Sequence, residues 1–393
     1  MFKDSANLNL VSQRMVGGLY DLKNDKITID IFSDIHFNGF QHVNQMLFNE
    51  IQHSHKYQVR FFQRFYMHGL SFNRIRNLLR GLLNQILIKK NQVPDKQMKI
   101  PDVYTIYSFP PSQLSFLNWI NSSLVRYQIG RLSDIAIIFV PSPGLQFLFS
   151  SYQRLVYYCV HDSIAQNYPQ NILEYEKRLV TLSRYVLCDN EQVLTRLANG
   201  SVYQNISKKS NKKTKFYYIP APVPNEFYEQ NNTEASEYDF IYFGSLHKDI
   251  DTHIFKKIYS AGYSILCITE KNEFYNLIEN FVTWNPITSS LKELNSYIAK
   301  GKYILLPYQN TKFMYTVTPA KINQCLVTGK KVFCTNKLLS DKYNLIYFDD
   351  CKSISEIIDT AQSITTNELT HLNIKNIAIE IMRLLEDNKG NNS

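Results

Sequence analysis

The sequence has little glycine or proline, 13 of each among 393 residues, and no repeated or low-complexity segment. This scarcity excludes collagen-like and disordered chains. Its six cysteines include no CxxC pair and no cysteine–histidine cluster with the spacing of zinc ligands. Their neighbours are mostly apolar, so we expect reduced thiols in the core of a cytoplasmic protein.

Long apolar runs are also missing. The first fifteen residues lack the apolar stretch of a signal peptide, and no run approaches the roughly 20 residues that cross a bilayer. We therefore expect a soluble or peripheral protein. Apolar residues are nevertheless abundant at 44%, with 27 Tyr and 24 Phe. A chain of this length can bury substantial cores, and its length predicts two or three domains.

Positive charge is concentrated in one stretch. The formal net charge is +9, and residues 51–100 hold ten Lys or Arg against a single acid, Asp95. Arg74, Arg76 and Arg80 lie there beside an apolar face, a pattern typical of a surface helix that binds anionic lipid headgroups. A solvated basic face and nucleic-acid binding are the alternatives, but no zinc finger, RNP signature or basic leucine-zipper heptad favours nucleic acid.

Short apolar runs alternate with amphipathic stretches, which predicts an α/β fold with parallel sheets. Strands are expected at 27–32, 57–62, 103–108, 135–140, 155–160, 185–188 and 216–219, and then at 238–243, 263–268, 281–283, 303–306, 332–334 and 346–348. Helices are expected at 41–53, 72–91, 114–130, 171–182, 190–198, 250–261, 271–279, 290–299, 318–329 and 367–387. No GxGxxG motif follows the first strand, so the dinucleotide-binding fingerprint is absent.

A proline-rich and then polar segment, PAPVPNEFYEQNNTEASE, predicts an interdomain boundary. We expect a first domain over 1–219, a linker over 220–236, a second domain over 237–370, and a C-terminal helix and tail over 371–393. Two α/β halves joined in this way place a ligand cleft between them, at the carboxyl ends of the strands.

The predicted helix that begins at Thr318 contains an unusual cation. Thr318 suits the N-cap, Pro319 the first helical position and Gly329 the C-terminal stop. Lys321 falls in the first turn, where the helix dipole disfavours a cation by about 0.3–1 kcal/mol. A bound phosphate would remove this conflict, and Gln324 shares the same helix face. An ordinary surface lysine is the alternative.

Three motifs together resemble those of GT-B glycosyltransferases. They are YFGSL at 242–246, YYCVHDS at 157–163, and P-x-K-x-x-Q-x-x-x-x-G-K-x-V at 319–332. In detail they are similar to the glucuronosyltransferase type of the xanthan pathway and to teichuronic-acid and capsule transferases. The resemblance covers about residues 27–340.

The resemblance implies two Rossmann-like domains that face each other across a cleft, with a C-terminal helix that crosses back to the first domain. Lys321 and Gln324 would then hold the diphosphate and sugar of the donor, at the helix start formed by Thr318 and Pro319. Tyr308 would contact the donor. Gly244 and Ser245 would let the backbone approach it.

The stereochemistry of transfer is indicated by a departure from the family pattern. Retaining GT-B enzymes carry a Glu-x7-Glu pair, whereas Thr316 and Gln324 stand at these spacings here. This favours inversion with Asp162 as the base. Asp162 is equally a candidate for capping a turn, and the adjacent His161 is an alternative base.

No metal or other cofactor is expected. Asp249 and Asp251 form a D-x-D pattern, which binds a metal in another transferase fold. Beside Gly244 we expect them to begin a helix instead, because acids suit the positive end of the dipole. Trp119 and Trp284 are expected to be packing residues.

These observations predict transfer of a sugar from a nucleotide-sugar, UDP by resemblance, to a lipid-linked or polysaccharide acceptor in bacterial surface polysaccharide synthesis. The enzyme would act on the cytoplasmic face of the plasma membrane, with an anionic membrane surface and no nucleic acid as partner. A nucleotide-sugar 2-epimerase of the same architecture and a non-catalytic nucleotide-sugar-binding protein are the alternatives.

Overall fold

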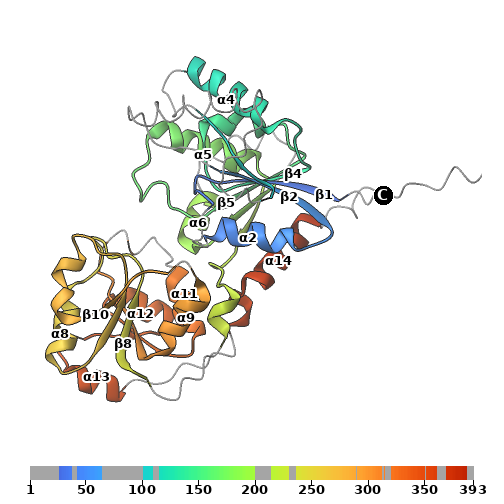
Figure 1. Cartoon of the computed structure of the whole chain (residues 1–393). Helices are drawn as coiled ribbons and strands as arrows, with labels where there is room; N and C mark the ends of the chain where they lie inside the picture. The colour runs from blue at the N-terminus through green and yellow to red at the C-terminus, as the bar shows by residue number, and fades with distance from the viewer. Residues whose placement is uncertain are drawn as a thin grey trace, which may run out of the picture.

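The computed structural model describes residues 26–37, 42–63, 101–108, 115–199, 214–229, 236–288, 290–311, 314, 320–349, 351–360 and 369–386. They form two lobes, each built on a parallel β-sheet with helices on its faces (Figure 1). The alternation of strands and helices expected from the sequence is therefore confirmed.

The sheet of the first lobe has the strand order β3-β2-β1-β4-β5-β6-β7. Its strands are β1 Ile27–Phe32, β2 Tyr57–Gln63, β3 Val103–Thr105, β4 Ile135–Ile138, β5 Arg154–Cys159, β6 Tyr185–Cys188 and β7 Lys215–Tyr218. Its helices are α2 Val43–Gln52, α4 Ser115–Ile129, α5 Gln170–Leu182, α6 Glu191–Asn199 and the 3-10 helix η1 Pro143–Leu148. The order reverses between β1 and β4, which is where parallel α/β sheets open a crevice for ligands.

The continuous apolar character of these strands follows from burial of both sheet faces. In β4, Ile135 and Ile137 belong to one hydrophobic core, while Ala136 and Ile138 belong to the core on the opposite face. All four side chains are fully buried. The sheet is therefore a central layer between two layers of helices.

The sheet of the second lobe has the order β10-β9-β8-β11-β12-β13. Its strands are β8 Tyr238–Phe243, β9 Ile265–Ile268, β10 Thr283–Asn285, β11 Gly301–Leu306, β12 Lys331–Cys334 and β13 Ile346–Tyr347. Its helices are α8 His253–Ser260, α9 Leu291–Ala299, α11 Ala320–Val327, α12 Lys337–Tyr343 and α13 Ile354–Thr360. These elements enclose one large core.

The last helix, α14 (Ile374–Glu386), crosses back to the first lobe and lies beside α2 (Figure 1). Val223 bridges Asn373 in parallel at the crossing point, where two chain segments pass between the lobes. Ile377 and Ile381 then join the core that also contains Phe48 of α2. The C-terminal crossing implied by the resemblance is confirmed.

One predicted helix is wrong. Residues 271–279 form short 3-10 turns, η3 (Tyr275–Leu277) and the start of η4 (Glu279–Phe281), instead of an α-helix. The Asn272 side chain accepts hydrogen bonds from the backbone N–H groups of Phe274 and Tyr275, at 3.0 and 3.1 Å. Such a local turn competes with helix formation. Helices η1, α12 and α13 were not expected, and the expected helix at 72–91 lies outside the described residues.

In the part of the chain that the structure describes, no helix combines the length and the apolar content needed to cross a membrane.

Candidate functional site

The candidate donor site lies where β8 ends. Gly244 follows β8 directly, with φ of +113°, and its N–H donates to the Ile268 carbonyl at 2.9 Å. A Cβ atom at this position would overlap the Nζ and Cε atoms of Lys321. Two features therefore require glycine at this position: the positive φ angle, and the Lys321 side chain that fills the space of a Cβ atom.

Lys321 reaches this turn from the first described turn of α11, on the side of the second lobe that faces the first (Figure 1). Its Nζ atom lies 5.3 Å from the ring centre of Tyr242 and 5.6 Å from that of Phe243. Within the described residues, no carboxylate forms an ion pair with Lys321. Aromatic faces attract the cation weakly, so its charge is available to an anionic ligand.

Burial lowers the pKa of the Lys321 ammonium below its ordinary value, while the nearby Cys325 and Cys267 act in the opposite direction. A bound diphosphate would favour the charged form, because an opposite charge close by stabilises an ion. The site therefore gains most from a ligand that brings negative charge.

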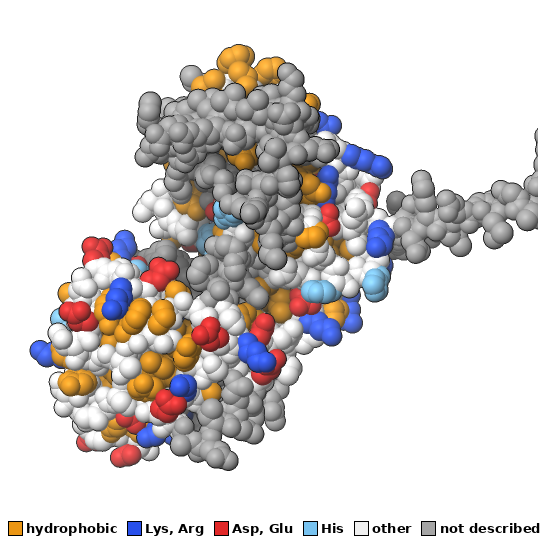
Figure 2. All heavy atoms as spheres, viewed as in Figure 1, with side chains coloured by type: hydrophobic (Ala, Val, Ile, Leu, Met, Phe, Trp, Pro, Cys, Tyr) orange, Lys and Arg blue, Asp and Glu red, His pale blue; other side chains and the backbone are white. Residues whose placement is uncertain are grey.

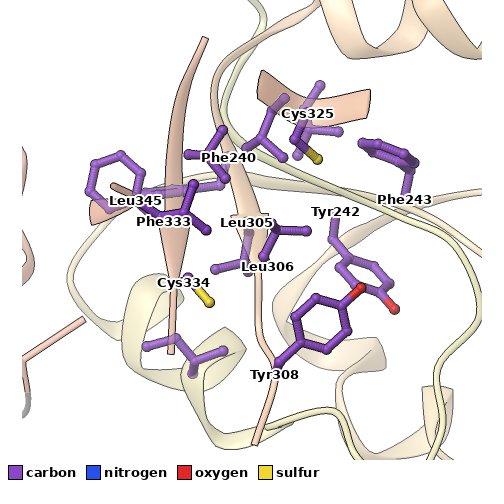
Figure 3. Packing of buried hydrophobic residues seen from close by; sticks show 14 of the residues in the cluster. Phe240, Tyr242, Phe243, Leu305, Leu306, Tyr308, Cys325, Phe333, Cys334 and Leu345 are labelled. Carbon is purple, nitrogen blue, oxygen red and sulfur yellow. The ribbon is translucent and has the colours of Figure 1, made fainter. Parts of the chain in front are cut away.

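Two buried tyrosines, Tyr242 and Tyr308, lie in the core beside the turn at Gly244. The Tyr242 hydroxyl donates to the Ser245 carbonyl at 2.8 Å and so holds the turn in place. Tyr308, only 6% exposed, lies in the same core as Tyr242 (Figure 3), and burial together with the neighbouring Tyr308 raises the pKa of the Tyr242 hydroxyl. Ser245 itself is exposed. Contact of Tyr308 and Ser245 with a donor remains a prediction.

The other residues predicted for donor or membrane binding are placed only in part. Gln324 is partly buried on α11, one turn after Lys321, so the shared helix face expected from the sequence is present. Thr318, Pro319, Arg74, Arg76 and Arg80 lie outside the described residues.

Asp162 makes the contacts of a turn-capping residue. Its Oδ1 atom accepts from the backbone N–H groups of Ile164 and Ala165, at 3.0 and 3.3 Å. The same atom lies 3.2 Å from Nη2 of Arg196. Arg196 also approaches Glu176, with Nη1 and Oε2 3.8 Å apart. The turn role that the sequence left open is thus present, while the role of Asp162 as a base remains a prediction.

A second acidic centre was missed by the sequence interpretation. Asp34 follows β1, His42 precedes α2 and His161 follows β5. Burial raises the pKa of Asp34, and the neighbouring His161 and His42 offset part of this rise. Burial lowers the pKa of both histidines, and Asp34 opposes the shift in each. The three groups therefore interact electrostatically near the carboxyl edge of the first sheet.

Both histidines keep solvent-accessible surface although burial shifts their pKa values. Figure 2 shows histidine side chains at several places on this face of the molecule. The position of Asp34, two residues after the end of β1, was the signal that could have identified this centre.

Of the two aspartates expected to begin a helix, Asp251 does so, whereas Asp249 lies four residues before α8. Asp251 Oδ1 accepts from the His253 N–H at 3.1 Å, at the start of α8, as expected from the sequence. Asp249 Oδ2 lies 3.6 Å from Nδ1 of His247. Burial lowers the pKa of His247, Asp249 raises it, and Lys321 lowers it further. His247, three residues after Gly244, is a second candidate phosphate contact that the sequence interpretation missed.

Solved structures resemble almost the whole chain. The N-terminal domain of a trehalose-6-phosphate phosphatase from Candida albicans matches with a TM-score of 0.56 and 8% identity, covering 92% of this chain and 97% of that one. A UDP-forming α,α-trehalose-phosphate synthase from Burkholderia xenovorans matches with a TM-score of 0.54 and 8% identity, covering 92% and 99%. AviGT4, a glycosyltransferase involved in avilamycin A biosynthesis, matches with a TM-score of 0.50 and 9% identity, covering 92% and 98%.

No protein-family model matches the sequence, and no curated protein is similar to it in sequence. At identities this low, the structural likeness shows the fold. The chain has the GT-B architecture of two Rossmann-like domains.

Proposed function

We propose that this protein is a glycosyltransferase that takes its sugar from a nucleotide-sugar. The observation that carries the proposal is the Lys321 ammonium group, packed on Gly244 at the end of β8 without an ion-pair partner among the described residues. A cation held against a backbone turn and a helix start is a site for phosphate. UDP is the nucleotide we favour, because one structural neighbour is described as UDP-forming.

The proposed reaction uses a carboxylate base at the carboxyl edge of the first sheet and the Lys321 ammonium in the second lobe. A base removes the proton of the acceptor hydroxyl, whose oxygen attacks the anomeric carbon of the sugar. The bond between that carbon and the diphosphate oxygen breaks, and UDP leaves with the electron pair. The Lys321 ammonium stabilises the negative charge that develops on the leaving group. Attack from the face opposite the leaving group inverts the configuration.

Two carboxylates are candidates for the base. Asp162 was predicted from the sequence, but its Oδ1 atom already binds two backbone N–H groups and Arg196. Burial raises the pKa of Asp34, although His161 offsets part of the rise, and a carboxylate with a raised pKa is a better proton acceptor. These contacts favour Asp34.

We further propose a lipid-linked or polysaccharide acceptor in the synthesis of a bacterial surface polysaccharide such as a capsule. The support is the basic stretch within residues 51–100, with Arg74, Arg76 and Arg80, which suits an anionic membrane surface on the cytoplasmic side. The donor and acceptor serve as substrates without a metal, so a chelator should leave turnover unchanged.

The donor site is tested with a panel of UDP-, GDP- and CMP-sugars in thermal-shift assays, followed by calorimetry of UDP binding. Lys321→Met should weaken UDP binding at least about tenfold, since a charge-assisted hydrogen bond contributes about 1.5–3 kcal/mol. Lys337→Met is the matched control, because Lys337 also begins a helix but pairs with Asp341 at 2.9 Å. Equal UDP affinity in both variants would contradict the donor site.

Turnover assays distinguish Asp34 from Asp162 as the base. They also distinguish a glycosyltransferase from an epimerase and from a non-catalytic binding protein. Asp34→Asn should lower the rate of acceptor-dependent UDP release at least about 100-fold, while the affinity for UDP stays unchanged. Asp162→Asn keeps the turn acceptor and should retain activity. The reverse pattern would make Asp162 the base. An epimerase would interconvert two UDP-sugars without net release of UDP, and a binding protein would release none.

A further inference from the structure

Helix α4 buries Val125 and Ile129 in the core of the first lobe, yet it also exposes a second set of large apolar side chains. Phe116, Trp119 and Tyr127 are 68%, 66% and 75% exposed, and Leu117 is 43% exposed. The residues on the opposite side of this helix include three polar ones, Asn118, Asn121 and Ser122, which are at most 8% exposed. A surface helix normally buries its apolar face and exposes its polar one. We call the exposed set Phe116, Leu117, Trp119 and Tyr127 the α4 aromatic face.

The buried polar residues have defined partners, so the orientation of the helix is specified. Asn118 Nδ2 donates to the Tyr175 hydroxyl at 3.3 Å, and the Ser122 hydroxyl donates to the Pro143 carbonyl at 3.4 Å. Asn121 Nδ2 lies within van der Waals contact of the position that a Cβ atom of Gly144 would take, at 3.4 Å. A half-turn of the helix would break these contacts and leave polar groups buried without partners, which is costly.

Two of the exposed rings lie against each other. Phe116 and Trp119 stack with their ring centres 6.4 Å apart. Hydrophobic side chains gather at the top of the view in Figure 2, where α4 lies in Figure 1. Clustered exposed apolar side chains mark an interaction surface, whereas scattered single ones do not.

The chemistry of this surface fits a lipid bilayer. Trp, Tyr and Phe are the side chains enriched at the boundary between headgroups and acyl chains. Helix α4 has no acidic residue, and its one charged side chain, Arg126, is exposed together with Arg131 just beyond it. The chain as a whole carries a net charge of +9, which complements anionic headgroups.

We infer that the α4 aromatic face docks the first lobe on an anionic lipid surface. The rings enter the headgroup boundary, while Arg126 and Arg131 contact lipid phosphates. This inference deepens the proposed function, because it rests on a lipid-linked acceptor that the enzyme must meet at a membrane. It adds a candidate membrane contact among the described residues to the one predicted from the sequence for Arg74, Arg76 and Arg80.

The test is sedimentation with vesicles of phosphatidylcholine, with and without phosphatidylglycerol, at low and high salt. The double variant Phe116→Ser/Trp119→Ser should bind anionic vesicles at least about tenfold more weakly, because two large apolar side chains no longer enter the boundary. Tyr259→Ser is the matched control. Tyr259 is 54% exposed, but it lies on α8 of the other lobe, so its loss should leave vesicle binding unchanged.

Tryptophan fluorescence gives a second readout, because Trp119 belongs to the α4 aromatic face. The chain contains two tryptophans, Trp119 and Trp284, so Trp284→Phe leaves Trp119 as the sole tryptophan. Its emission should shift to shorter wavelength on addition of anionic vesicles, as water leaves the indole ring. An unchanged emission, or equal vesicle binding by the double variant, would overturn the inference.

Two further outcomes separate lipid docking from its rivals. If the double variant elutes as a smaller species than the wild type and still binds vesicles, the α4 aromatic face joins two copies of the chain and lipid docking is wrong. Binding of UDP, which needs no acceptor, is measured without vesicles. Absence of UDP binding in the wild type would refute the proposed function, while the vesicle assays alone decide the docking.

Discussion

The most demanding contact in the candidate donor site joins a glycine and a lysine. Gly244 has a positive φ and carries the Lys321 ammonium directly against its Cα. The sequence placed Gly244 in the donor site and Lys321 in the first turn of a helix. Their contact depends on how β8 and α11 pack, which involves residues more than 70 positions apart and cannot be obtained from local patterns.

Gly244→Ala should lower UDP affinity at least about tenfold, because the added methyl group displaces the ammonium that would bind the diphosphate. The positive φ adds a stability cost of about 1–2 kcal/mol. Gly262→Ala is the control, since Gly262 has φ of +85° but nothing within 4 Å of its Cβ position. Calorimetry with UDP should separate the two variants, and an unchanged affinity in Gly244→Ala would contradict the contact.

Asp189, directly after β6, predicts how the stability of the folded protein depends on pH. Burial raises its pKa to about 8, so the folded protein keeps this proton at a pH where the unfolded chain has lost it. The folded pKa lies above the unfolded value of 3.8, and stability therefore falls as pH rises from about 4 to 8.

Asp189→Asn should remove this part of the pH dependence and raise the melting temperature most at pH 8. Asp359→Asn, at an exposed position on α13, is the control and should leave the dependence as in the wild type. Thermal melts across this pH range provide the measurement. A wild-type slope in Asp189→Asn would show that its carboxyl is ionised in the folded protein.

At the scale of elements, the strands were predicted well because continuous apolar runs report burial on both faces, as in β4. The prediction of a helix at 271–279 was wrong because the Asn272 side chain accepts hydrogen bonds from nearby backbone N–H groups and forms a local turn. Helix α14 shows what pattern alone could not specify. Its apolar stripe indicated an amphipathic helix, but its packing beside α2 in the first lobe depends on tertiary contacts.

Ile381→Ala in α14 should lower the free energy of unfolding by about 2–5 kcal/mol, because the side chain is fully buried in the core of the first lobe. Ile379→Ala, two residues away on the same helix and 41% exposed, should cost much less. Urea unfolding of both variants measures the difference. Similar costs would mean that α14 does not dock as described.

At the scale of the whole molecule, α14 links the two lobes, since it follows the second in sequence and packs in the core of the first. Each lobe contains one tryptophan, Trp119 in α4 and Trp284 in β10. The variants Trp119→Phe and Trp284→Phe therefore report on one lobe each.

Both single-tryptophan variants should melt at the same midpoint, and UDP should raise both midpoints, because a ligand that binds the native state stabilises the whole cooperative unit. Fluorescence melts with and without UDP provide the measurement. A shift seen by Trp284 alone would show that the lobes unfold independently and that α14 does not couple them.

The sequence by itself determined the α/β class, the alternation of strands and helices, and the position of Lys321 in the first turn of a helix, because these depend on periodicity and local end signals. Only the tertiary structure decided which side chains meet. It set Lys321 against Gly244 and Asp34 near His161, and it turned the aromatic residues of α4 outward. Such contacts join residues that are far apart in the chain, or depend on which face of an element packs inward, and local pattern contains neither.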